Sequence, residues 1–389
     1  MKKISLLNVL STAALLMSSM AHAATIDCSS LTSRTETLNG KSYTKYNVVD
    51  SAFMKCDQIQ KMRPVMNWKV TKTGWSTQDE SNFSAFIKKI GYSKCNTTDK
   101  CLSSDANMLR SEEDMQFTHY SDCADFPYYL RSYFAYKNKL PFAMVSSFQQ
   151  APFSETQQAQ IAAERARILA EKGEEFALKY DAQVRDARYS RNGNIPTAKI
   201  NVPSSSGAVR DFAVLGPKIM DQISSGTLRM LNGSGGSVES DFYSPAVTKE
   251  SIKPGTVLYN VSGHVAIVYD VTAKGEVLYV DAHPDNSITR GVFNPDFKLV
   301  KSLYGGNFKN FRPVQVVNAT MATDGSIAKG QVVVAGDSEI ADFSMEQYEG
   351  LGKNSAGNTI FKLYAHDTKA VNFYDWVKFK LSGGSYRLD

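Results

Sequence analysis

"HVAIVYDVTAKGEVLYVDAHPDN", residues 264–286, consists of two β-rich runs on either side of a short polar turn. Valine, isoleucine and tyrosine dominate both runs and favour strands, and the "TAKGE" between them is typical of a hairpin turn. The β-rich stretches "GTVLYNV" and "FRPVQVVNA" lie before and after this pair. The pattern predicts an antiparallel sheet in the part of the chain that begins at Lys253.

The chain upstream of Lys253 has a mainly helical pattern. In residues 77–95, apolar side chains recur at helical spacing after an acidic first turn. Residues 128–142 predict an aromatic helix that is broken at Leu140-Pro141, and "AMVSSF" predicts a strand after it. Residues 154–188 predict one long charged helix with a capping-box start, and we interpret it as a solvated insertion because apolar heptads are not sustained. Helices combined with an antiparallel sheet predict an α+β fold.

The first 23 residues have the layout of a secretory signal peptide. Two lysines precede a short apolar run that ends in the small-x-small site Ala21-His22-Ala23. We expect residues 24–115 to form a disulfide-bonded N-terminal region, 116–320 a core with the insertion at about 154–190, and 321–389 a C-terminal extension packed on that core. The protein is therefore expected to be secreted into the periplasm, without a lipid anchor or stable membrane insertion.

The composition of the 389 residues is that of an ordinary globular protein, with 42% hydrophobic and 21% charged residues. The formal net charge of +5 is small for this length, and no Lys/Arg stripe with interleaved aromatic residues indicates nucleic-acid binding. The sequence has no glycine-rich phosphate loop, no His-x-x-x-His and no Cys-x-x-Cys motif. We therefore expect no cofactor, no metal site and no nucleic-acid partner, and make no prediction of the oligomeric state.

All five cysteines follow the predicted cleavage site. An oxidising compartment favours disulfides, and an odd number of cysteines leaves one thiol unpaired. Cys95 and Cys101 flank the polar loop "NTTDK", which is short enough to be closed by a disulfide, and Cys28 and Cys56 are then the remaining pair. This pairing leaves Cys123 as the free thiol.

Cys123 lies in "SDCADFPYYL", just ahead of the predicted aromatic helix. Proline is tolerated in the first turn of a helix, so Pro127 requires the helix to begin at or soon after Cys123. A helix N-terminus favours the thiolate, which is the nucleophilic form of cysteine. The placement indicates a reactive thiol, and a small buried core cysteine is the alternative.

A nucleophilic thiol needs a base, and His264 is the candidate because it opens a strand that packing would hold rigid. His119 is close to Cys123 in sequence, but it precedes the helix and is expected to point away. If "TAKGE" forms the hairpin, Asp281 comes beside His264, where a carboxylate would fix the imidazole tautomer. His283 lies two residues further along the same face and is the alternative third member.

Other polar residues are candidates for completing the cleft. The backbone N–H of Cys123 is one expected donor to an oxyanion, and the side chain of Gln116 is a candidate for the second. Tyr120 and Tyr243 are candidates for lining the cleft.

In order and context, these residues resemble the papain-like Cys-His superfamily. "DCADFPYYL" and "KPGTVLYNVSGHVAIVYDV" resemble the NlpC/P60 and CHAP peptidoglycan hydrolases, in which Asp-Cys opens the helix and a "PGD"-type turn precedes the histidine strand. "CADFPYYLRSYFAYKNKLPFAMVSS" with "LYVDAHPDN" is similar to the transglutaminase-like core, in which the third residue is an aspartate. The resemblance covers about residues 121–148 and 253–286. The sequence departs from NlpC/P60 proteins in having Ala124-Asp125 in place of Ser-Gly and a long insertion before His264.

The resemblance implies a papain-like core, in which a cysteine at a helix N-terminus packs on the antiparallel sheet that carries the histidine. It also implies acyl transfer, in which His264 takes the proton of Cys123, the thiolate attacks an amide carbonyl, and water or an amine resolves the thioester. The expected activity is a thiol-dependent amidase or endopeptidase that cleaves peptidoglycan stem peptides. The alternatives are a transglutaminase-like acyl transferase and a catalytically silent papain-like module that binds cell-envelope peptides or a partner protein.

Overall fold

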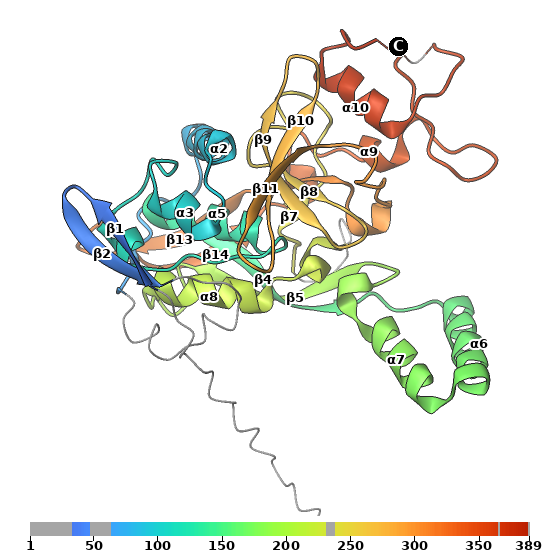
Figure 1. Ribbon diagram of the computed structural model, residues 1–389, viewed down its shortest axis with the longest axis horizontal. Coiled ribbons are helices and arrows are strands. Elements are labelled where there is room, and N and C mark those ends of the chain that lie inside the picture. The colour runs from blue at the N-terminus through green and yellow to red at the C-terminus, as the bar shows by residue number, and fades with distance from the viewer. Residues whose placement is uncertain (1–32, 47–63, 231–237, 365, 388–389) are drawn as a thin grey trace, which may run out of the picture.

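The computed structural model describes residues 33–46, 64–230, 238–364 and 366–387 (Figure 1). The predicted signal peptide and the predicted pair of Cys28 and Cys56 lie outside these residues. Within them the chain combines helices with antiparallel sheets, which confirms the predicted α+β class. None of the helices in the described part is long and apolar enough to cross a membrane.

A six-stranded antiparallel sheet organises the C-terminal half, with the strand order β11-β10-β9-β8-β12-β7. Its strands are β7 (Phe242–Tyr243), β8 (Val257–Tyr259), β9 (Val265–Val271), β10 (Val277–Ala282), β11 (Ile288–Val292) and β12 (Phe308–Phe311). The predicted hairpin joins β9 to β10, and the N–H of Thr272 donates to the carbonyl of Glu276 across its turn (2.9 Å). The sheet predicted from the two β-rich runs is therefore present.

Side chains at alternate positions of β9 enter two different cores. Val265 and Ile267 belong to the larger core, whereas Ala266 and Val268 belong to a smaller one on the opposite face. Successive side chains of a strand point to opposite faces, so a strand buried on both faces is apolar at consecutive positions. The unbroken apolar run "VAIV" thus follows from the position of β9 in the middle of the sheet.

Two helices, α2 (Thr77–Tyr92) and α5 (Phe126–Lys137), contact β9 from the side of the larger core, and α8 (Phe212–Gln222) packs against α5. Every residue of α5 from Phe126 to Tyr136 is buried, which explains why this helix is aromatic around its whole circumference. Side chains of α10 (Phe373–Leu381) pack into the smaller core on the other face. The helix predicted in residues 77–95 and the aromatic helix are both confirmed.

The remaining elements are short or peripheral. Two-stranded antiparallel sheets pair β1 (Ser33–Leu38) with β2 (Lys41–Tyr46), β3 (Asn67–Trp68) with β6 (Arg210–Asp211), β4 (Phe142–Gln150) with β5 (Asn194–Val202), and β13 (Val314–Met321) with β14 (Ile327–Val334). Short α-helices are α3 (Thr98–Ser103), α4 (Glu112–Gln116) and α9 (Glu346–Glu349). The 3-10 turns are η2 (Ala187–Tyr189), η3 (Ser225–Leu228), η4 (Ser302–Tyr304) and η5 (Asp337–Glu339).

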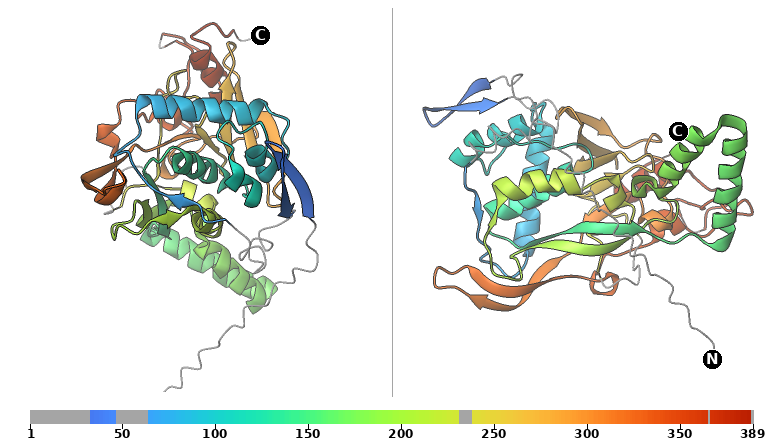
Figure 2. Two further views of the ribbon diagram at one scale, coloured as in Figure 1. Left: turned by 90° about the vertical axis from the view of Figure 1, so that its left-hand side faces the viewer. Right: turned by 90° about the horizontal axis from the view of Figure 1, so that it is seen from below.

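The predicted helical insertion projects from the end of the β4–β5 ribbon as a pair of helices (Figure 2). The capping box at Ser154 is confirmed, but the prediction of one long helix is wrong. Gly173, with a φ of 88°, ends α6 (Glu155–Lys172) and begins α7 (Glu174–Arg185). Glycine adopts positive φ at little cost, so the chain can reverse there. No residue of α6 is buried, so this pair of helices is almost entirely exposed to solvent.

The cysteines in the described residues agree with the prediction that Cys95 pairs with Cys101 and that Cys123 is free. Cys95 and Cys101 form a disulfide, and Cys123 is the free cysteine of the described part. The disulfide links the end of α2 to α3, on the chain segment that leads into α4 and the turn that carries Cys123.

Candidate active site

Cys123 lies in the turn that leads into α5, and its thiol is partly exposed. Asp122 organises this turn, because its side chain accepts the backbone N–H of Ala124 (2.9 Å) and its own N–H donates to the side chain of Asp125 (2.9 Å). Pro127 occupies the first turn of the helix, as predicted. The local sequence therefore holds the thiol at the positive end of a buried helix.

Asp125, two residues from the thiol in the sequence, is shifted toward its protonated form. Its side chain is buried, and burial raises the pKa of this carboxyl well above its ordinary value, with the neighbouring Asp122 as the next cause. This shift reduces the negative charge beside a Cys123 thiolate.

His264 directly precedes β9 and contacts two polar side chains. Its Nε2 atom is 2.7 Å from Oδ2 of Asp281. Its pKa is raised to about 9, first by the hydrogen bond to Asp281 and then by a hydrogen bond to Cys123, against the opposing effect of burial. Because Nε2 is bonded to Asp281, Nδ1 is the ring nitrogen left for the thiol. The structure thus brings the three predicted residues into one chain of interactions.

Asp281 is the buried residue of the three, with a side chain that is 4% exposed. Its second carboxylate oxygen accepts a hydrogen bond from Oγ1 of Thr289 (2.6 Å), which is its register partner on β11. Burial opposes ionisation, but the hydrogen bonds from His264 and Thr289 outweigh it and lower the pKa of Asp281. An ionised acceptor at this place fixes the orientation of the imidazole and stabilises its charged form.

His283 lies at the edge of the same group. Its Nε2 atom is 3.0 Å from Oγ1 of Thr289 and 3.8 Å from Oδ2 of Asp281, and its ring stacks against that of His264 with centroids 6.0 Å apart. Because Thr289 donates its hydroxyl proton to Asp281, it accepts from His283. Asp281 is therefore the direct hydrogen-bond partner of the candidate base, whereas His283 is hydrogen-bonded to Thr289 and lies at the longer distance of 3.8 Å from the carboxylate.

The other candidates have different surroundings. His119 is buried and bonds to the hydroxyl of Tyr129 (2.9 Å), so it is held inside the protein. Tyr120 is also buried, and its hydroxyl donates to the carbonyl of Pro284, which ties the segment before Cys123 to the loop after β10. Gln116 is exposed at the end of α4.

Tyr243, the remaining cleft candidate, donates its hydroxyl to Asp342 (2.8 Å) and lines a pocket beside Arg131 that is formed by other residues than Cys123 and His264. It is thus placed with a different group of side chains from the candidate triad. Within the residues that the structure describes, no three His, Cys, Asp or Glu side chains are placed to share a metal ion.

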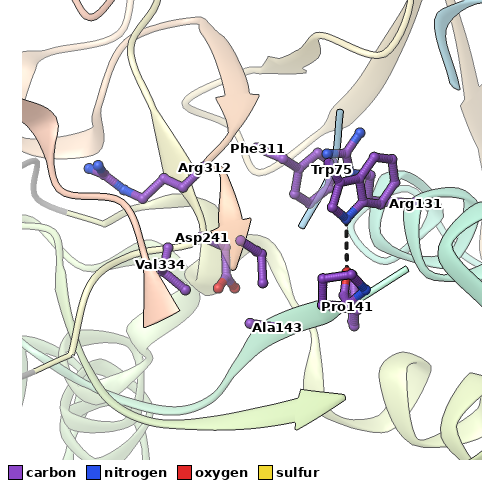
Figure 3. Close-up of a pocket in the computed structure, with 10 residues that line it drawn as sticks. Trp75, Arg131, Pro141, Ala143, Asp241, Phe311, Arg312 and Val334 are labelled. Atoms are coloured by element: carbon purple, nitrogen blue, oxygen red, sulfur yellow. Dashed lines mark hydrogen bonds between the residues drawn. The ribbon is translucent and has the colours of Figure 1, made fainter. Parts of the chain in front are cut away.

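A pocket on the flank of α5 contains neither Cys123 nor His264 among its lining residues (Figure 3). Arg131 lies over the ring of Trp75 (3.3 Å to its centroid), and the indole N–H of Trp75 donates to the carbonyl of Pro141 (2.8 Å). The guanidinium makes two hydrogen bonds to Glu80, at 2.8 and 2.6 Å. The charge of Arg131 is thus paired with Glu80 and stacked on Trp75, which indicates that Arg131 has a structural role.

Thr289 is the site residue that the sequence interpretation missed. The one feature that could have revealed it is the register of β10 with β11, which places Thr289 opposite Asp281. In an antiparallel pair, residues directly opposite each other have neighbouring side chains. To find Thr289 from the sequence, the strand after "HPDNS" would have had to be paired in register with the strand that carries Asp281. No protein-family model, curated protein or solved structure matches this chain.

The raised pKa of His264 predicts a pH dependence of stability. The folded-state pKa is about 9 against an ordinary 6.5, so folding takes up a proton between these values. The stability from this site is fully present below about pH 6.5 and is lost as the pH rises through about 9. Urea unfolding should therefore show a steeper fall in the free energy of unfolding over this interval for the wild type than for His264→Gln.

The measured quantity is the difference in free energy of unfolding between the wild type and His264→Gln. This difference is used because Lys309, present in both proteins, changes stability with pH in the direction opposite to His264. Burial lowers its pKa to about 7, so its own contribution to stability rises with pH. Parallel pH profiles for the wild type and His264→Gln would mean that His264 is not held in its charged form by Asp281 and Cys123.

Proposed function

We propose that this protein is a thiol-dependent amidase or endopeptidase with a papain-like core. In this proposal Cys123 is the nucleophile, His264 the base and Asp281 the residue that orients the base. The observation that carries it is the position of one imidazole between a buried carboxylate and a free thiol at a helix start. This combination of nucleophile, base and orienting acceptor recurs in acyl-transfer enzymes on unrelated folds.

The reaction proceeds through a thioester. His264 accepts the proton of Cys123, and the sulfur forms a bond to the carbonyl carbon of the scissile amide while the carbonyl oxygen becomes an oxyanion. The C–N bond then breaks, and His264 returns the proton to the departing amine. Water, deprotonated by His264, attacks the thioester and releases the carboxylic acid and the free thiol. Asp281 stabilises the imidazolium in each half of the reaction.

The backbone around Cys123 supplies a donor for the oxyanion. The N–H groups of Asp122, Ala124, Asp125 and Phe126 all donate to Asp122 or Asp125. Across the described residues, the N–H of Cys123 has no such partner and remains available at the helix start. A preorganised donor at this point contributes about 3 kcal/mol of transition-state stabilisation in comparable sites.

We propose peptidoglycan stem peptides as the substrate class and the periplasm as the location. The layout of residues 1–23 and the Cys95–Cys101 disulfide both fit an exported protein. The resemblance of the segments around Cys123 and His264 to peptidoglycan hydrolases supports the choice of substrate.

The test is digestion of purified peptidoglycan sacculi by the protein lacking residues 1–23, with the soluble products identified by mass spectrometry. The expected products are fragments that have gained one water at a peptide bond, and they should be absent with Cys123→Ala. Intact sacculi after incubation with a protein whose Cys123 is reactive would reject peptidoglycan as the substrate while leaving the chemistry standing.

A second candidate is a transglutaminase-like acyl transfer, and the presence of an aspartate beside His264 favours it. In that reaction an amine, in place of water, attacks the thioester and forms a new amide. Adding a fluorescent primary amine to the same digestion distinguishes the two, because hydrolysis leaves the amine unincorporated. A silent binding module would leave both peptide and amine unchanged.

A further inference from the structure

Arg229 lies directly after η3, and two other segments of the chain meet at its buried side chain. One terminal nitrogen, Nη1, donates to the carbonyl of Val261 (3.0 Å) and to the hydroxyl of Tyr259 (3.1 Å). The other, Nη2, donates to the carbonyl of Ser190 (2.7 Å). Arg229 therefore links the end of β8, the loop that follows it, and the chain just before β5.

The guanidinium is bound by uncharged groups. Its acceptors in the described part of the chain are two carbonyls and one hydroxyl, and it lies over the ring of Tyr304 with 4.0 Å to the centroid. Tyr304 in turn donates its hydroxyl to the carbonyl of Arg191 (2.9 Å), next to Ser190. A planar group with several donors can hold three acceptors and stack on a ring at once, whereas a lysine ammonium cannot.

Val261 belongs to the loop that carries the candidate base. This loop closes on itself, because the N–H of Asn260 donates to the carbonyl of His264 (2.9 Å) and the N–H of Gly263 donates to the carbonyl of Asn260 (2.8 Å). Gly263 has a φ of 99°, and a Cβ at this position would lie 3.2 Å from Oγ of Ser225, in η3. The loop is thus packed against η3, and Arg229 follows η3 directly.

Ser190 belongs to the root of the helical insertion, by which we mean residues 190–193 between η2 and β5. It follows η2, the turn that connects α7 to β5, and the insertion beyond that root is nearly all exposed to solvent. Figure 2 shows α6 and α7 projecting away from the body of the protein. The contacts of Arg229 and Tyr304 with Ser190 and Arg191 therefore hold the root of the insertion against the loop before His264.

We propose that Arg229 is a positioning residue, which fixes the loop at residues 260–263 to the root of the α6–α7 insertion and thereby holds His264 in line with Cys123. The inference rests on the proposed function for its effect on chemistry, but the link between loop and root can be measured independently of any substrate. It assigns a role to the insertion as well: its root is part of the scaffold that positions the base.

The test combines amide hydrogen exchange with alkylation of Cys123 in Arg229→Met, Arg229→Lys and Arg167→Met. Arg167 is the matched control because it is an exposed arginine on α6 that pairs with Glu164 and Glu171 of the same helix. In Arg229→Met the amides of Asn260 and Gly263 are expected to exchange about 10-fold faster, because local opening near the loop becomes easier. Alkylation at about pH 6, where it depends on His264, is expected to fall several-fold, with partial recovery in Arg229→Lys.

The controls separate this effect from general unfolding. The amides of Thr272 and Gly275, in the β9–β10 turn, should exchange at the wild-type rate in all variants, and Arg167→Met should match the wild type throughout. If Arg229→Met does not fold, Tyr304→Phe tests the same link, because it removes only the hydroxyl bond to Arg191 and keeps the ring under the guanidinium.

The assignment would be overturned if the loop amides of Arg229→Met exchanged at the wild-type rate. If Arg229→Met does not fold, the same result in Tyr304→Phe would overturn it. Faster loop exchange with unchanged His264-dependent alkylation would overturn it too, because the loop would then be loosened without displacing the base. A wild-type thiol that reacts independently of His264 would instead contradict the proposed function, and the exchange rates alone would then decide whether Arg229 links the loop to the root.

Discussion

Replacing Cys123 with alanine is expected to lower amide hydrolysis by about 10⁴-fold or more, because the site loses the thiol that forms the acyl intermediate. The same loss is expected for His264→Ala. Nucleophile and base act as one unit, so the double variant should be no slower than either single variant. Initial rates with the same peptide substrate measure all three.

The fold should survive these changes, because the Cys123 thiol is only partly buried and the disulfide lies elsewhere. His366→Ala is the matched histidine control, since that side chain is 85% exposed and lies outside the site. Cleavage that persists in Cys123→Ala at the wild-type rate would show that another residue performs the chemistry.

Replacing Asp281 with alanine is expected to lower kcat by about 10²–10⁴-fold, because the imidazole loses the acceptor that fixes its tautomer and stabilises its charge. Without the hydrogen bond to Asp281, the pKa of His264 should move from about 9 toward its ordinary 6.5. The alkaline limit of activity, set by loss of the imidazolium that accompanies the thiolate, should therefore move to lower pH. The pH profile of kcat/KM measures this shift.

Two further variants decide the identity of the third residue. Thr289→Val removes one hydrogen bond to Asp281 and should have a smaller effect in the same direction. His283→Ala should stay close to the wild type, since His283 is hydrogen-bonded to Thr289 and its ring nitrogen lies 3.8 Å from the carboxylate, beyond hydrogen-bond distance. If His283→Ala lost activity and Asp281→Ala kept it, the third member would be His283.

The features predicted from the sequence are those fixed by short-range chemistry. Pro127 limits where α5 can start, so the position of Cys123 could be derived from five neighbouring residues. The "TAKGE" turn forces β9 and β10 to pair, and this pairing brings Asp281 to His264. In both cases a local signal determines which side chains meet.

The features that were missed depend on contacts between distant segments. The break at Gly173 lies between two charged runs that both favour helix, so the pattern continues smoothly through it. The pairing of β4 with β5 spans the whole insertion. Arg229 contacts Ser190 and Val261, which lie far from it in the sequence, and no periodicity or motif marks such a meeting point.

The most direct test of the central claim is alkylation of the folded, oxidised protein with iodoacetamide across pH, with the modified residue located by mass spectrometry. The account predicts selective reaction at Cys123 that persists well below about 8.5, the ordinary pKa of a thiol, and that is slowed in His264→Ala. An unlabelled Cys123, a Cys123 found in a disulfide, or equal rates in the wild type and His264→Ala would contradict it.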